Sequence, residues 1–216
     1  MANFKKDSGN SMKGVNQICV VRPGREATNE NGKVTAKYVE IMADNSKLTK
    51  AEIAAGKGQA SPNLYSKRTT YVDKNGETKQ GYDNSIRITP SQLDAIEKAG
   101  EGKSLVKEDG TKYIPFKSDL MGLNESVKDK DGQAVMNENG KTKTKLVGYM
   151  PNTKTLEPSD YGKLTQARLD KHYNNTKAVH AQQAKMAAAE KSASLSATAE
   201  KADVQVEATA EAEASK

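Results

Sequence analysis

The 216-residue sequence is poor in the residue types that build large cores and reactive centres. It contains no Trp, 2 Phe, 1 Cys and 2 His, and only 35% of its residues are hydrophobic. An average globular domain is roughly 45–50% apolar, so we expect a small core. The 8 Tyr supply most of the aromatic surface, and their hydroxyls favour positions at a water-facing edge.

The scarcity of cysteine and histidine excludes several kinds of site. The single cysteine, Cys19, excludes an intrachain disulfide and a multi-cysteine zinc site. Its apolar neighbours Ile18 and Val20 indicate a buried thiol. His172 and His180 are separated by about 12 Å of helix, so we expect a solvated face and no shared metal. No other histidine could act as a general base, so we expect a non-enzymatic protein without cofactor or metal.

Long hydrophobic runs are also missing. The mean hydropathy is −0.82, and no stretch approaches the roughly 20 apolar residues of a membrane span. Residues 1–18 hold no apolar core of a signal peptide. The sequence therefore predicts a cytoplasmic, non-secreted protein without membrane contact.

Two motifs resemble known sites but lack a required residue. Residues 100–104 (GEGKS) resemble the end of a phosphate-binding loop, yet Glu97 stands at the position of the leading glycine. Residues 127–138 resemble a calcium loop, yet Val127 replaces the first ligand. We interpret both as ordinary connections. An enzyme that uses carboxylates alone stays a third possibility, although nothing singles out a pair of acids.

Charge is unevenly distributed along the chain. Residues 186–216 carry three lysines and six acidic residues, and the whole chain has a net charge of +6, so the other 185 residues carry +9. A basic body with an acidic tail favours contact with a polyanion and competition from the tail. Simple solubility is the alternative interpretation.

Turn signals divide the first 150 residues into strands. Asn-Gly and Asp-Gly dipeptides favour two-residue hairpin loops, because they tolerate positive φ. The chain has five, at residues 31–32, 75–76, 109–110, 131–132 and 139–140. They predict hairpins that join 67–72 to 77–82, 104–108 to 111–116, and 132–136 to 141–150, with longer strands over 15–22 and 33–43.

Helix start signals occur at three places. Thr49 with Glu52 and Thr89 with Gln92 form capping-box pairs, which predict two short helices packed on the sheet. Residues 158–160 (PSD) predict the start of a long helix. From residue 192 onward the sequence is low in complexity and has little to bury, which favours disorder.

These signals predict an α+β fold. It consists of an antiparallel, hairpin-rich sheet, in one version an OB-like partial barrel, with two short helices, a long C-terminal helix and a disordered tail. The expected boundaries are a flexible N-terminus over 1–14, a basic β-rich domain over 15–150, a C-terminal helix over 151–191 and an acidic tail over 192–216.

Basic residues alternate with tyrosines in the β-rich domain. Rings on a curved sheet can stack bases while neighbouring cations contact phosphates. The alternative is that the lysines solubilise outward faces and the tyrosines edge the core. The candidate nucleic-acid-binding residues are Lys37, Tyr38, Tyr65, Lys67, Arg68, Tyr71, Lys112, Tyr113, Lys143 and Lys145.

Two hypotheses of function follow. The first is a non-enzymatic nucleic-acid-binding protein, with single-stranded DNA or RNA favoured over duplex. The second is a structural or assembly protein of a virion or mobile element, whose helix and tail, residues 186–216, bind partner subunits. The sequence leaves the oligomeric state open.

Overall fold

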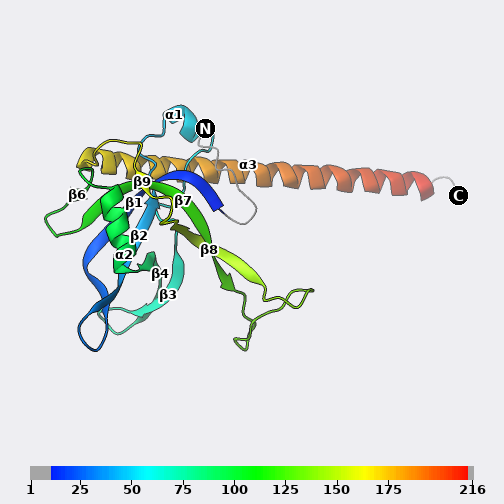
Figure 1. The fold of residues 1–216 in the computed structure, drawn as a ribbon. Helices are drawn as coiled ribbons and strands as arrows, with labels where there is room; N and C mark the ends of the chain where they lie inside the picture. Colours follow the sequence, from blue (N-terminus) through cyan, green and yellow to red (C-terminus); the bar gives the residue numbers. More distant parts are fainter. Residues whose placement is uncertain (1–10, 214–216) are drawn as a thin grey trace. The chain divides into compact units, whose positions relative to one another are not determined.

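The computed structural model describes the backbone of residues 11–213 and the side chains of residues 11–193 (Figure 1). The chain divides into two compact units. The first unit comprises Met1–Lys47 with Ser61–Tyr173, and the second comprises Leu48–Ala60 with Asn174–Lys216. Residues 1–10 and 214–216, which include part of the predicted N-terminus and tail, lie outside the described residues.

The first unit is built on a seven-stranded antiparallel sheet that nearly closes into a barrel, as predicted for the fold class (Figure 1). The strand order is β5-β2-β1-β7-β6, and β8 and β9 also pair with β7. A separate hairpin consists of β3 (Lys67–Val72) and β4 (Thr78–Asp83). The strands of the main sheet are β1 (Ser11–Thr28), β2 (Val34–Ala43), β5 (Ser85–Ile88), β6 (Leu105–Val106), β7 (Lys112–Ser126), β8 (Thr144–Pro151) and β9 (Glu157–Pro158).

The middle of strand β1 is buried on both faces. Its apolar run around Cys19 supplies side chains to both sides, as expected of a strand that is covered twice. One face, with Cys19, contributes to the barrel interior, together with Ile41, Phe116 and Leu120. The opposite face, with Ile18, contributes to an outer cluster that also contains Val20, Met42, Tyr113, Leu164 and Leu169. The expected burial of Cys19 is confirmed.

A short segment, Asn63–Tyr65, bridges the gap between the two ends of the sheet. The Leu64 amide donates to the carbonyl of Ile41 on β2 at 2.8 Å, and the Tyr149 amide of β8 donates to the Leu64 carbonyl at 2.9 Å. Beyond this segment, β5 and β8 are not paired with each other in the described part of the chain. The barrel therefore has an open seam between these two strands.

All five predicted dipeptides lie in five-residue turns of one kind. The amide of the first turn residue donates to the carbonyl of the fifth, and the amide of the glycine, which is the fourth residue, donates to the carbonyl of the first. These are three-residue loops, so the prediction of two-residue loops was wrong. In four of them an Asn or Asp at the first position accepts two amides at its Oδ1, which favours this longer turn. The turns span 29–33, 73–77, 107–111, 129–133 and 137–141.

Two of the three predicted hairpins are confirmed, namely β3 with β4 and β6 with β7. The third forms only at its tip, where Met136 and Thr142 make an isolated bridge and the Lys143 amide donates to the Val135 carbonyl at 2.7 Å. The rest of the predicted pairing is wrong, because residues 144–151 pair with β7 as strand β8. Pairing with β7 lets Met150 of β8 pack on the barrel core, whereas Met136 is 59% exposed. Strand β1 also begins at Ser11, within the N-terminus predicted to be flexible, and pairs there with β7.

Both short helices form with the predicted capping boxes, as α1 (Lys50–Ala54) and α2 (Pro90–Ala99). Helix α2 packs on the sheet as expected, because Leu93 and Ile96 enter the barrel core. Helix α1 belongs to the second unit and buries none of its residues. There, side-chain amides of the long helix hold the segment 48–60: Gln182 donates to the Ala54 carbonyl at 3.0 Å and Asn175 to the Leu48 carbonyl at 3.2 Å.

The long helix, α3 (Gln166–Glu213), begins later than predicted. Residues 157–158 pair with β7 as strand β9, so the chain cannot turn helical there. Thr165 caps the helix instead: its hydroxyl accepts the Arg168 amide at 3.2 Å and its carbonyl accepts the Leu169 amide at 3.0 Å. The side chains of residues 194–216, which make up most of the predicted tail, lie outside the described residues.

A buried polar cluster anchors the first turns of α3 within the first unit. Arg168 Nη2 lies 2.5 Å from Asp44 Oδ2, and the Arg168 guanidinium also donates to the Gly162 carbonyl. His172 is fully buried, and its Nδ1 accepts the Asn45 amide at 3.1 Å. The expected solvated face was therefore wrong for His172. It was right for His180, which is exposed.

The burial of His172 predicts a pH-dependent stability. Burial lowers its pKa, the Asp44 carboxylate opposes this shift, and the Arg168 guanidinium adds to it. The unfolded chain therefore binds this proton more readily, and the free energy of unfolding should fall as the pH drops below about 6.5, until the folded-state pKa is passed. Urea unfolding of wild type and His172→Gln between pH 7.5 and 5 measures this effect. The variant should lose less stability over this range than wild type or His180→Gln, and parallel losses would contradict the assignment.

The close approach of the Asn63–Tyr65 segment to Gly148 predicts that a side chain at this position lowers the stability of the fold. A Cβ there would lie 2.8 Å from Tyr65 Cδ2 and 2.9 Å from the Leu64 carbonyl oxygen. Gly148→Ala should therefore displace the bridging segment and lower the free energy of unfolding by about 1–3 kcal/mol. Urea denaturation measures the change. The control is Gly162→Ala, whose Cβ would meet nothing within 4 Å, and equal stability of the two variants would argue against the bridge.

Candidate functional site

A hollow of about 380 Å³ lies between the β3–β4 hairpin and the outer face of the barrel. We call it the hairpin groove. Strands β1 and β2 form one wall and the hairpin forms the other. Its lining includes Arg22, Arg25, Tyr38 and Glu40 on the barrel side, and Thr69 and Tyr71 on the hairpin side.

Strand alternation aims these side chains into the groove. On β2, the partly exposed Tyr38 and Glu40 alternate with the buried Val39 and Ile41. On β3, Tyr71 shares a face with Thr69, whose cross-strand partner is glycine 81. A Cβ at that glycine would lie 2.9 Å from Tyr71 Cε1, so the missing side chain leaves room for the Tyr71 ring.

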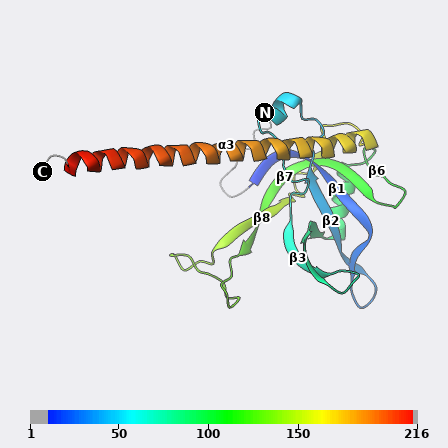
Figure 2. The ribbon, with the colours of Figure 1, turned by 180° about the vertical axis from the view of Figure 1, so that it is seen from behind.

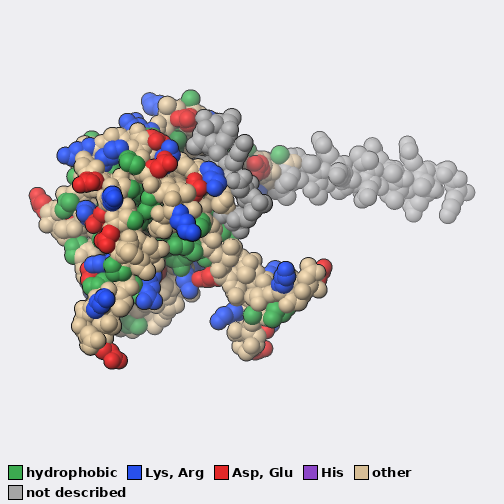
Figure 3. Space-filling view, in the orientation of Figure 1, with side chains coloured by type: hydrophobic (Ala, Val, Ile, Leu, Met, Phe, Trp, Pro, Cys, Tyr) green, Lys and Arg blue, Asp and Glu red, His purple; other side chains and the backbone are tan. Residues whose placement is uncertain are grey.

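The groove contains both signs of charge. Arg22 Nη2 lies 3.2 Å from Glu40 Oε1. Hydrogen bonds from the Ser85 hydroxyl and amide lower the pKa of Asp83, and the charges of Arg25 and Lys67 act in the same direction. Figure 3 likewise shows Lys and Arg side chains interspersed with Asp and Glu over the visible face. The aromatic rings, more than net positive charge, distinguish this surface.

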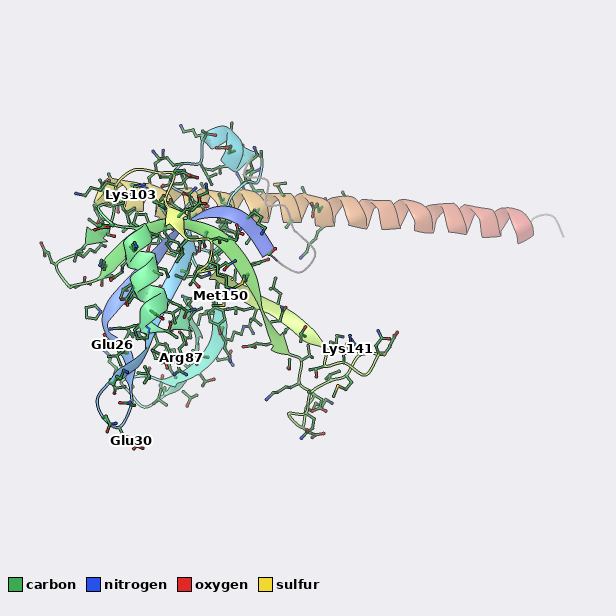
Figure 4. The ribbon with its side chains drawn as sticks, in the orientation of Figure 1. Glu26, Glu30, Arg87, Lys103, Lys141 and Met150 are labelled. Atoms are coloured by element: carbon green, nitrogen blue, oxygen red, sulfur yellow. The ribbon has the colours of Figure 1, made fainter. Side chains whose placement is uncertain are left out.

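A second hollow, of about 400 Å³, lies at the open seam of the barrel. We call it the seam pocket. It shares Tyr38, Asp83 and Ser85 with the hairpin groove. Arg87 on β5 and Met150 on β8, both labelled in Figure 4, line it from the two strands that border the seam. The two hollows therefore adjoin along the outer edge of β2 and β5.

The structure brings together only some of the predicted site residues. Tyr38 and Tyr71 line the groove, and Tyr65 lines the seam pocket. Lys67 and Lys145 flank the pocket's Glu125, the first by an ion pair of 3.4 Å and the second as its cross-strand partner.

The other predicted residues line neither hollow. Arg68 projects from the opposite face of β3 to Tyr71, because the two positions differ by an odd number of residues. Lys37 pairs with Glu26, Lys112 pairs with Glu97 at 2.7 Å, and Lys143 is exposed before β8. Tyr113 is buried in the outer cluster, with Lys107 Nζ 5.2 Å from its ring centroid.

Three arginines of these hollows were missed from the sequence: Arg22, Arg25 and Arg87. Each lacks a neighbouring tyrosine along the chain, which was the pattern used. A weaker signal was present at Arg87, which stands between the buried Ile86 and Ile88 and so had to face outward. In the sheet, Arg87 lies directly opposite Tyr38.

The described residues contain no group of three or more His, Cys, Asp or Glu that could hold a metal ion. The Cys19 thiol is fully buried, and burial raises its pKa, with Glu97 adding to the shift. Within the part of the chain that was searched, no helix has the length and apolar character to cross a membrane.

Comparison of the chain with protein-family models, with curated proteins and with solved structures found no match. The function proposed below therefore rests on the two hollows themselves.

Proposed function

We propose that the protein is a non-enzymatic nucleic-acid-binding protein that holds a single strand in the hairpin groove. The observation that carries this proposal is the convergence of Tyr38 and Tyr71, from two separate sheets, beside Arg22 and Arg25. The sequence separates these residues widely, and only the fold assembles them.

The lining suits unpaired bases and their phosphates. Stacking of a base on an aromatic side chain contributes about 1–3 kcal/mol, and duplex bases are not available for it. The two arginines can contact phosphate oxygens in a planar, bidentate way. Arg22 Nη1 is a buried donor that makes no hydrogen bond to any described residue, and a donor left without an acceptor is costly.

The topology supports the same reading. The successive strands β1, β2, β5, β7 and β8, with α2 between the third and fourth, resemble a five-stranded OB-like barrel. Barrels of this kind bind oligonucleotides on the face of their second and third strands and with the loops after the first and fourth. The second and third strands here are β2 and β5, where the two hollows lie.

The loop after the fourth strand adds exposed lysines. Residues 127–143 extend beyond the ends of β7 and β8 (Figures 1 and 2). Lys128, Lys130, Lys141 and Lys143 lie in this loop, against Asp129, Asp131 and Glu138. These lysines are available to contact the phosphates of a nucleic-acid strand that leaves the seam pocket. Lysines in exposed ion pairs elsewhere can exchange a carboxylate for a phosphate at little cost.

The alternative function is that of an assembly protein of a virion or mobile element, which binds partner subunits through the second unit. One observation favours it: residues 184–193 of α3 all expose their side chains. A helical segment whose side chains are all exposed gains stability when a partner covers it. Binding of this kind would depend little on salt.

The groove predicts a selective effect of its two tyrosines. Tyr38→Ala and Tyr71→Ala should each weaken binding of single-stranded DNA by about 1–3 kcal/mol, because a stacking surface is lost. Tyr→Phe at the same positions should retain most of the affinity. Fluorescence anisotropy of labelled single- and double-stranded oligonucleotides, at two salt concentrations, measures these affinities.

The matched charge control compares two arginines. Arg25→Ala, which removes a groove cation, should weaken binding, whereas Arg68→Ala, at a residue that lines neither hollow, should not. Absence of single-strand binding at low salt would overturn the proposal. In that case light scattering and partner capture with the full chain would test the assembly function.

A further inference from the structure

We infer that the seam pocket receives one unstacked base of the bound strand and prefers guanine. This inference rests on the proposed function and deepens it, because it assigns a base preference to a second site beside the hairpin groove.

The pocket exists because the barrel is only partly sealed. The Asn63–Tyr65 segment pairs with β2 and β8 at one end of the seam. Strand β5, Ser85–Ile88, pairs with β2 along one edge, and its other edge has no strand partner among the described residues. Side chains that belong to the barrel core are therefore reachable from the surface at this point. Leu123 and Met150 both pack against the core and line the pocket.

The walls suit a flat apolar ring. Ile86, Leu123, Val147 and Met150 form the apolar lining, and Tyr65 adds an aromatic ring. The volume of about 400 Å³ falls within the range of small-ligand sites, roughly 300–1,000 Å³. Because Tyr38 borders both hollows, a base in the pocket can follow directly on a base stacked in the groove.

The rim decides which base fits. Asp83 and Glu125 present carboxylate acceptors, and Arg87 and Asn124 present donors. Guanine has two adjacent donors, N1–H and the 2-amino group, beside the O6 acceptor, so a carboxylate can accept both donors while a guanidinium or amide donates to O6. Adenine, cytosine and thymine each place an acceptor where guanine has one of these donors. The carboxylate of Asp83 is ionised at neutral pH, as an ordinary aspartate is, and hydrogen bonds from Ser85 lower its pKa further.

The experiment compares oligonucleotides that differ in one base. Labelled all-thymidine DNA is measured by fluorescence anisotropy beside the same strand with one central guanine, adenine, cytosine or hypoxanthine. The guanine strand should bind about tenfold more tightly than the all-thymidine strand. Hypoxanthine, which lacks the 2-amino group, should lose much of this gain, and adenine and cytosine should show none.

Two variants locate the preference. Val147→Phe fills the pocket, and Glu125→Gln replaces an acceptor by an amide at a partly exposed position. In each variant the ratio of the guanine-strand affinity to the all-thymidine affinity should fall towards one. Tyr71→Ala, in the groove, should weaken both strands and retain the ratio. If Val147→Phe does not fold, as judged by circular dichroism, Glu125→Gln decides alone.

The outcomes separate the two levels of the proposal. If neither strand binds, the proposed function fails. If the all-thymidine strand binds and guanine brings no gain, or if Glu125→Gln retains the full preference, the function stands and the assignment of the seam pocket to guanine is wrong.

Discussion

The first unit depends on one strand, β1, that pairs along both of its edges. From Gln17 to Val21 it bonds to β2 on one side and to β7 on the other. In the described sheet it is the link between the β2–β5 pair and the group formed by β7, β6, β8 and β9. Its apolar run supplies both the barrel interior and the outer cluster, so pairing and burial act on the same residues.

The hairpin groove lies on the outer face of the sheet, beyond the part of that face that other side chains cover. Near Ile18 and Met42 the outer face of the sheet is covered by Leu164 and Leu169, which flank the start of α3. Further along the same face, Arg22, Tyr38 and Glu40 form the wall of the hairpin groove. A sheet face with few covering side chains and several rings is typical of a surface that binds ligands. The incomplete closure between β5 and β8 adds the seam pocket beside it.

The polar groups of this unit divide into a buried and an exposed set. Asp44 and His172 are buried, and the Arg168 side chain is 10% exposed. Together they hold the start of α3 against the end of β2, where loss of one partner would leave a charge without compensation. The ion pairs of Lys37, Lys67 and Lys112 are partly exposed and contribute little to stability. Such pairs leave the lysines available to other anions.

The sequence by itself determined the local features of this protein. The capping boxes at Thr49 and Thr89, the positions of the five turns, the burial of Cys19 and the antiparallel class are all set by neighbouring residues, through hydrogen bonds and strand alternation. The tertiary structure alone decided which strand β8 pairs with, where α3 begins and that His172 is buried. It also decided that Tyr38 and Tyr71 meet Arg22 and Arg25, because contacts between distant strands depend on the burial available to the whole sheet. No local pattern encodes that burial.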